Sequence, residues 1–143
     1  MSILAYDGKL IAADRQGTIN DTRGTMKKLV KVGNVVIGWV GTQTNGLIMM
    51  RWFLDGADPA KFPETNDDPG TCSRLIVVSK KELILFEASP EPMKFLDKKQ
   101  AFGSGMDLAL GAMAMGANAK QAVQIACKYD IHCGMGIDWF EVR

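Results

Sequence analysis

The sequence has little of what links or anchors small proteins. Its three cysteines, Cys72, Cys127 and Cys133, are odd in number and lack C-x-x-C spacing, which argues against a disulfide framework and a zinc site. Its first twenty residues include Asp7 and Asp14 and no apolar signal core, and no apolar run reaches the ~20 residues that cross a bilayer. We therefore expect a cytoplasmic protein with no leader segment and no membrane partner.

The sequence also lacks an excess of charge of either sign. It has 17 basic and 16 acidic residues, a formal net charge of +1. This balance gives no electrostatic reason to expect a nucleic acid as partner. A chain of 143 residues that is 47% apolar and 23% charged is typical of an ordinary globular protein, so we expect residues 1–143 to form a single domain.

Several catalytic motifs are missing as well. The sequence contains no Walker A loop, no dinucleotide-binding glycine motif, no H-E-x-x-H and no G-x-S-x-G, so it predicts no cofactor and no metal. Its one histidine, His132, is next to Cys133. Adjacent strand residues point to opposite faces, so these two residues form a poor pair of base and nucleophile.

What the sequence does contain is a series of hairpin patterns. Asp7-Gly8, Gly33-Asn34 and Lys80-Lys81 each lie between two apolar runs, and such spacing predicts three hairpins. We expect the first strand to begin at Ser2. Further strands are expected in "PMKFLD" and "GIDWFEV".

Three other segments have a helical pattern. "TQTNGLIMMRWFLDGADP" can be capped by Thr42 or Thr44 and ends at Gly56, "MDLALGAMAMG" follows later, and "NAKQAVQIACKYD" begins with a capping box of Asn118 and Gln121. Hairpins combined with two adjacent helices favour the α+β class over an alternating parallel sheet. We predict two antiparallel sheets stacked between two helical layers.

One catalytic route needs no histidine. It uses an N-terminal hydroxyl amino acid whose own α-amine, with a pKa near ~7.7 to 8.0, is the base. Ser2 would supply both groups once Met1 is removed, which we expect in the active form because an amide nitrogen cannot accept a proton. Such a centre also needs a cation, a carboxylate and a backbone donor, for which Lys28, Asp14 and Gly41 are candidates.

Four blocks of the sequence, in this order, resemble the proteasome β subunits and the HslV peptidase, which are N-terminal nucleophile (Ntn) hydrolases. They are "DGKLIAADRQGT", "KLVKVGNVVIGWVGT", "AFGSGMDLALGAM" and "AVQIACKYDIHCGMGI". The resemblance, to a short bacterial or bacteriophage form, implies the four-layer αββα sandwich of the Ntn hydrolases. It further implies a threonine-type endopeptidase, here with an N-terminal serine, that cleaves unfolded polypeptides through an acyl-enzyme. The expected assembly is a self-compartmentalised homo-oligomeric ring, with a separate ATP-dependent unfoldase as a partner.

The resemblance also implies roles for individual residues. Ser2 matches the nucleophile, Asp14 the carboxylate of the "AAD" block, and Lys28 the lysine that opens the next strand. Lys27 is an alternative to Lys28, because a shift of one residue in the hairpin would select it. Gly41 matches the glycine whose N–H faces the oxyanion. The shell around the terminal amine is matched by Ser104, Asp130 and Cys133, and the substrate-binding positions are Gly17, Thr18, Met26 and Trp39.

The chain departs from the family pattern at two of these positions. Ser2 stands where threonine is typical, and Cys133 stands where serine is usual. Two other interpretations therefore stay open: a non-catalytic structural or scaffold subunit of the same fold, and a small-molecule amidase on a related fold. The sequence specifies neither the ring size nor the cleavage preference.

Overall fold

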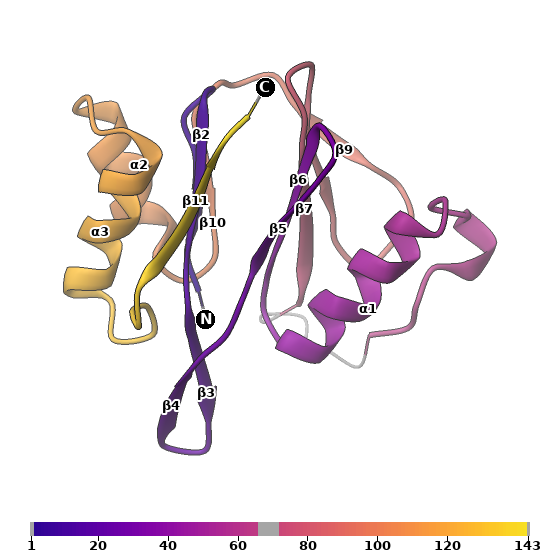
Figure 1. Ribbon diagram of the computed structural model, residues 1–143, viewed down its shortest axis with the longest axis horizontal. Coiled ribbons are helices and arrows are strands. Elements are labelled where there is room, and N and C mark those ends of the chain that lie inside the picture. The colour runs from indigo at the N-terminus through magenta and orange to yellow at the C-terminus, as the bar shows by residue number, and fades with distance from the viewer. Residues whose placement is uncertain (1, 66–71, 143) are drawn as a thin grey trace.

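The computed structural model describes residues 2–65 and 72–142, and these residues form four layers (Figure 1). Two antiparallel sheets face each other. Helices α2 (Met106–Ala114) and α3 (Ala119–Tyr129) cover the outer face of one sheet, and α1 (Gln43–Leu54) covers the outer face of the other. The predicted αββα sandwich of the α+β class is confirmed.

The first sheet contains both the early and the late strands of the chain. Its order is β10 (Gln100–Phe102), β1 (Leu4–Tyr6), β2 (Leu10–Asp14) and β11 (Ile137–Glu141). The predicted turn at Asp7-Gly8 joins β1 to β2, and the Asp7 carboxylate accepts the backbone N–H groups of Lys9 and Leu10 at 2.8 and 2.7 Å. Helix α3 packs on this sheet after the predicted capping box of Asn118 and Gln121.

The second sheet is a meander of five strands in chain order. These are β5 (Leu29–Val32), β6 (Val35–Val40), β7 (Arg74–Val78), β8 (Leu83–Phe86) and β9 (Met93–Phe95). The predicted turns at Gly33-Asn34 and Lys80-Lys81 are both present. Helix α1 begins after Thr42, whose hydroxyl lies 3.2 Å from Ser73 Oγ and makes no cap to the helix.

Several elements differ from the sequence-based expectation, among them β10, for which no strand was expected. The polar segment after β2 forms a separate hairpin of β3 (Gln16–Ile19) and β4 (Thr22–Thr25), which extends beyond the ends of the two sheets (Figure 1). A short 3-10 turn, η1 (Pro59–Lys61), follows α1. The first strand begins at Leu4 and not at Ser2, because the Ser2 carbonyl accepts the N–H of Gly105 instead of a partner in the sheet.

Alternating side chains of the strands divide the core into three layers. Ala13 and Leu4 face the space between the sheets, whereas Ala12 and Ala5 face α2 and α3. The layer under these two helices is rich in alanine, so the helices can lie close to the sheet. The layer under α1 contains larger side chains: Ile37, Trp39, Met49, Trp52, Leu75, Val77 and Phe86.

The strand directions bring five chain segments to one end of the sandwich. Ser2 precedes β1, Asp14 ends β2, and Lys28 precedes β5. Because β6 and β10 run antiparallel to β5 and β1, the residues that follow them, Gly41 and Gly103, lie at the same end. None of the helices described for this chain is long and apolar enough to span a bilayer.

Candidate active site

The centre of the candidate site is a buried contact between three predicted residues. Lys28 Nζ lies 2.9 Å from Ser2 Oγ and 2.9 Å from Asp14 Oδ1. The exposed fractions of Ser2, Lys28 and Asp14 are 1%, 5% and 0%. Lys27 is exposed, so of the two candidate lysines the structure brings only Lys28 to Ser2.

Asp14 holds more than the lysine. Its Oδ1 also accepts the N–H of Ile3 at 3.1 Å, and its Oδ2 accepts the N–H groups of Gln16 and Gly134 at 3.3 and 3.1 Å. A buried carboxylate is tolerated when a cation and several donors satisfy it. Asp14 therefore fixes Lys28, the residue after Ser2 and the loop that follows α3 in one arrangement.

A tight turn before α2 holds the other side of Ser2. The Ser2 carbonyl accepts the N–H of Gly105 at 3.3 Å and the hydroxyl of Ser104 at 3.4 Å. Gly103 has a φ of +104°, and a Cβ placed on it would lie 2.2 Å from the Ser2 carbonyl oxygen. Only glycine fits there. Sequence reasoning selected Ser104 and missed the roles of Gly103 and Gly105, although the "GSG" pattern was the available signal.

The predicted shell residues Ser104, Asp130 and Cys133 do meet one another. Cys133 Sγ lies 3.4 Å from Asp130 Oδ2 and 3.8 Å from Ser104 Oγ. Burial raises the pKa of the Cys133 thiol to about 12, so this thiol is a hydrogen-bond donor and not a thiolate nucleophile. Burial alone would raise the pKa of Asp130, but hydrogen bonds from the His132 backbone, Ser104 and Cys133 lower it overall.

Gly41 lies at the turn between β6 and α1. Its φ is +102°, and a Cβ there would lie 2.6 Å from Ser73 Cα. Ser73 Oγ accepts the N–H of Thr42 at 3.1 Å, which holds this turn. Gly41 is thus brought to the end of the sandwich that carries Ser2, with Ser73, which sequence reasoning missed, as its close neighbour.

Three of the four predicted substrate-binding residues lie along the β3–β4 hairpin and the segment after it. A Cβ on Gly17 would lie 2.3 Å from Met26 Sδ, so these two residues are in close contact, and Thr18 is exposed on β3. Trp39 lies elsewhere. It is 2% exposed and packs in the layer between the second sheet and α1, where its indole Nε1 donates to Gln43 Oε1 at 3.0 Å.

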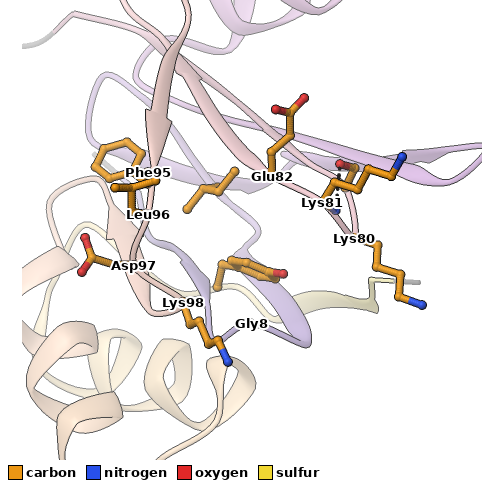
Figure 2. Close-up of a pocket in the computed structure, with 11 residues that line it drawn as sticks. Gly8, Lys80, Lys81, Glu82, Phe95, Leu96, Asp97 and Lys98 are labelled. Carbon is orange, nitrogen blue, oxygen red and sulfur yellow. Dashed lines mark hydrogen bonds between the residues drawn. The ribbon is translucent and has the colours of Figure 1, made fainter.

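Two cavities bear on where a ligand could approach. A cavity of about 320 Å³ beside Met26 is lined by Arg15, Thr25, Met26, Lys27 and Asp138, and the Arg15 guanidinium pairs with the Asp138 carboxylate. Another, of about 260 Å³, is shown in Figure 2 and lies between the β1–β2 turn, the β7–β8 turn and the segment after β9. Those turns are at the opposite ends of the strands from Ser2, so only the first cavity adjoins the candidate site.

Among residues 2–65 and 72–142, no three side chains of histidine, cysteine, aspartate or glutamate are grouped so that they could hold a metal ion. The arrangement around Ser2 is instead that of a hydroxyl paired with a buried ammonium. Such an ammonium stabilises negative charge on the oxygen and disfavours a second positive charge nearby. The geometry is suited to activating a serine oxygen without histidine or metal.

Comparison with known proteins gives matches in structure but not in sequence. No protein-family model and no curated protein matches the chain. The structure of Thiobacillus denitrificans BPH in complex with epoxomicin matches with a TM-score of 0.75 and 18% identity, covering 100% of both chains. HslV from Trypanosoma brucei matches with a TM-score of 0.73 and 22% identity, over 99% of this chain and 98% of that one.

A third match is more distant in sequence. An Anbu (Gly-1) mutant from Hyphomicrobium sp. strain MC1 has a TM-score of 0.71 and 12% identity, over 99% of this chain and 81% of that one. Identities this low establish the fold and leave activity to be argued from the site itself. The expected architecture is therefore confirmed over essentially the whole length: the chain has the proteasome β/HslV-type fold of the Ntn hydrolases.

Proposed function

We propose that this protein is a proteasome-like endopeptidase whose nucleophile is Ser2, exposed as the N-terminal residue by removal of Met1. The observation that supports this most strongly is the position of Lys28 Nζ, 2.9 Å from both Ser2 Oγ and Asp14 Oδ1. A buried, carboxylate-held ammonium beside a serine hydroxyl stabilises the negative charge that forms on the oxygen when a base removes its proton. The likeness in fold to HslV and BPH supports a peptidase over other hydrolases.

In the proposed reaction, Ser2 Oγ attacks the carbonyl carbon of the scissile peptide bond and its proton passes to the α-amine of Ser2. The Lys28 ammonium stabilises the developing charge on Oγ, and the N–H of Gly41 stabilises the oxyanion. The α-amine then protonates the departing amine, leaving an ester on Ser2. Water, deprotonated by the same α-amine, hydrolyses the ester and restores the serine.

The shell around Ser2 and the Lys28 ammonium would have different effects on the α-amine of the mature protein. The Asp130 carboxylate accepts a hydrogen bond from the Cys133 thiol, and Ser104 Oγ contacts both Cys133 Sγ and the Ser2 carbonyl. These groups would orient the new α-amine, while the Lys28 ammonium would lower that amine's pKa and keep it a base near neutral pH.

The β3–β4 hairpin is the proposed binding edge for substrate. An extended peptide would pair with the backbone at Gly17 and Thr18, in the manner of an added strand, with a side chain beside Met26. Trp39 is buried in the layer under α1 and does not line the cavity beside Met26, so it would act on this pocket only through Gln43 and the Lys27 backbone. The protein would act in the cytoplasm as a ring of identical subunits on unfolded polypeptides, with a separate ATP-dependent unfoldase for folded ones.

The test is chemical labelling of the mature terminus. Intact mass first establishes whether Met1 is absent. The protein is then incubated with epoxomicin, which BPH binds, or with a β-lactone, and with Ser2→Ala as control. We expect labelling of wild type alone, accompanied by cleavage of a denatured protein substrate. Equal labelling of both proteins would refute the role of Ser2.

A non-catalytic ring subunit is the second candidate, and the burial of Ser2 favours it, since only 1% of this residue is exposed. On that interpretation the Ser2, Lys28 and Asp14 contacts would be structural. A protein that retains Met1, leaves the probe unreacted and still forms rings would establish the second candidate over the first.

A further inference from the structure

We propose that Gln43 is a positioning residue, which together with Trp39 holds the backbone of Lys28 so that its ammonium reaches Ser2. The side chain of Gln43 bonds to Trp39 and to the backbone of Lys27, so it acts on the segment that carries the lysine. Its importance for catalysis depends on the proposed function, whereas its effect on Lys28 can be measured without any activity.

Gln43 forms a bridge between a buried indole and the peptide group that precedes Lys28. Its Nε2 donates to the Lys27 carbonyl at 2.8 Å, and its Oε1 accepts the Trp39 indole N–H at 3.0 Å. Both ends of the amide are therefore used, and the two contacts together determine which atom is oxygen and which is nitrogen.

The peptide group on the other side of Lys28 is held by the same tryptophan. The Trp39 backbone N–H donates to the Lys28 carbonyl at 3.1 Å. The carbonyls that flank the Lys28 Cα are thus both anchored, one by Gln43 and one by Trp39. This matters because Lys28 lies just before β5, outside the regular part of the strand.

The tryptophan at one end of this bridge is held in place by packing. Trp39 is 2% exposed and lies against the first turn of α1, where a Cβ on Gly46 would come within 2.2 Å of Trp39 Cδ1. Glycine at this position lets the helix approach the indole closely enough for Gln43, the first residue of α1, to reach it.

A lysine side chain is flexible, and its conformation has to be fixed by its surroundings. Its four-carbon stem has several rotatable bonds, so the place of Nζ depends on where the backbone starts it. The two distances of 2.9 Å to Ser2 Oγ and Asp14 Oδ1 leave little room for movement of that backbone. Loss of the bond from Gln43 to Lys27 would free the segment and lower the occupancy of the productive position.

Gln43→Glu tests this with little change in shape. Glutamate keeps an acceptor for the Trp39 indole but cannot donate to the Lys27 carbonyl when ionised. An acidic residue in the first turn of α1 also suits the helix dipole, so helix stability should not fall. Thr44→Glu is the matched control, because it adds the same charge to the same turn at an exposed position outside the bridge.

The readout is the reactivity of Lys28 toward formaldehyde with cyanoborohydride, located by peptide mass spectrometry. Lys27 is an exposed internal reference in the same peptide. We expect Lys28 to be protected in wild type and in Thr44→Glu, and to become several-fold more methylated in Gln43→Glu. Equal protection of Lys28 in all three proteins would overturn the proposal.

Turnover of a peptide substrate then separates the two proposals. We expect Gln43→Glu to lower kcat about 10-fold, as the loss of one hydrogen bond allows, with KM changed less than twofold and Thr44→Glu equal to wild type. If the wild type is inactive but Gln43→Glu makes Lys28 more reactive toward methylation, the peptidase proposal is refuted and the positioning role of Gln43 is supported. If the wild type is active and Gln43→Glu changes neither kcat nor the reactivity of Lys28, the peptidase proposal is supported and the positioning role of Gln43 is refuted.

Discussion

At the scale of single residues, the candidate site depends on one buried ion pair and its hydroxyl neighbour. Lys28 and Asp14 are nearly inaccessible, and each satisfies the charge of the other. Removing one partner of a buried pair leaves an uncompensated charge, whereas removing an exposed lysine costs little. Lys28 and its neighbour Lys27 therefore form a natural pair of test positions.

Lys28→Met should lower kcat/KM for peptide hydrolysis by at least ~100-fold, because no cation then stabilises the charge that develops on Ser2 Oγ. It should also lower the free energy of unfolding by ~3 kcal/mol, the lower range for breaking a buried pair. Urea unfolding and steady-state kinetics measure the two effects. Lys27→Met should match wild type in stability and in kcat, with any change confined to KM because Lys27 lines the cavity beside Met26; a folded, fully active Lys28→Met would exclude the proposed role.

The Cys133 thiol predicts a dependence of stability on pH. Burial raises its pKa to about 12 in the folded protein, so the thiol ionises at a lower pH in the unfolded chain than in the folded one. Its contribution to stability is complete below the unfolded pKa of ~8.5 and is lost as the pH rises toward the folded pKa. Unfolding free energies of wild type and Cys133→Ala should therefore converge as the pH rises from about 8.5 toward about 12.

Cys127 has a raised pKa of about 11 as well, mainly because of burial, but it is present in both proteins and cancels in the difference. A difference between wild type and Cys133→Ala that stays constant over this range would mean that the thiol is not protonated preferentially in the folded state.

At the scale of elements, turn chemistry explains most of what could be predicted. Asp7-Gly8 and Gly33-Asn34 identify hairpins locally, and the Asn118–Gln121 capping box identifies the start of α3. The β3–β4 hairpin could not be found in this way. Its segments, QGTI and TRGT, are exposed along much of their length and show no apolar alternation, so the period on which strand prediction depends is absent.

The candidate site was predictable only in part for a related reason. Asp14 and Lys28 stand at the ends of apolar strands and belong to recognisable blocks, but the choice between Lys27 and Lys28 depends on strand register, which burial reveals. Gly103, Gly105 and Gln43 act through backbone contacts between distant parts of the chain. Nothing local in the sequence signals such contacts.

Two glycines of the same region provide a matched test. Gly103→Ala should destabilise the protein by ~2 kcal/mol or more and impair labelling of Ser2, because φ is +104° and the new Cβ would overlap the Ser2 carbonyl. Gly111→Ala, inside α2 with open space around its Cβ position, should stabilise by ~0.5 to 1 kcal/mol. Thermal unfolding distinguishes the two, and equal effects would contradict the turn's proposed role.

At the scale of the whole molecule, an exposed apolar surface accompanies the fold. Met115, Ile125 and Tyr129 on or beside α2 and α3 are each more than a third exposed, as is Ile131 just beyond. Ile125 and Tyr129 are four residues apart on α3 and so share one face of it, and exposed apolar residues that adjoin one another are typical of surfaces that bind another protein. This agrees with the proposed ring of identical subunits.

Sedimentation should therefore detect a species that is a multiple of the 15.6 kDa chain, independent of whether Ser2 is active. Ile125→Asp, on the outer side of α3, should shift the sedimenting species from oligomer toward monomer, because a charge that is buried and unpaired in the interface disfavours association. Leu54→Asp, at the end of α1 on the other side of the sandwich, is the control. A wild type that sediments as a monomer at all concentrations would contradict the ring.

The hydrogen bonds around Ser2 and Asp14 also determine when during synthesis this centre can form. Residues 103–105 and Gly134 contact Ser2 or Asp14 directly, and β11, which pairs with β2, follows them near the end of the chain. On the proposed function, a nascent chain that has not yet reached Gly134 and β11 lacks these contacts and is therefore not yet a peptidase.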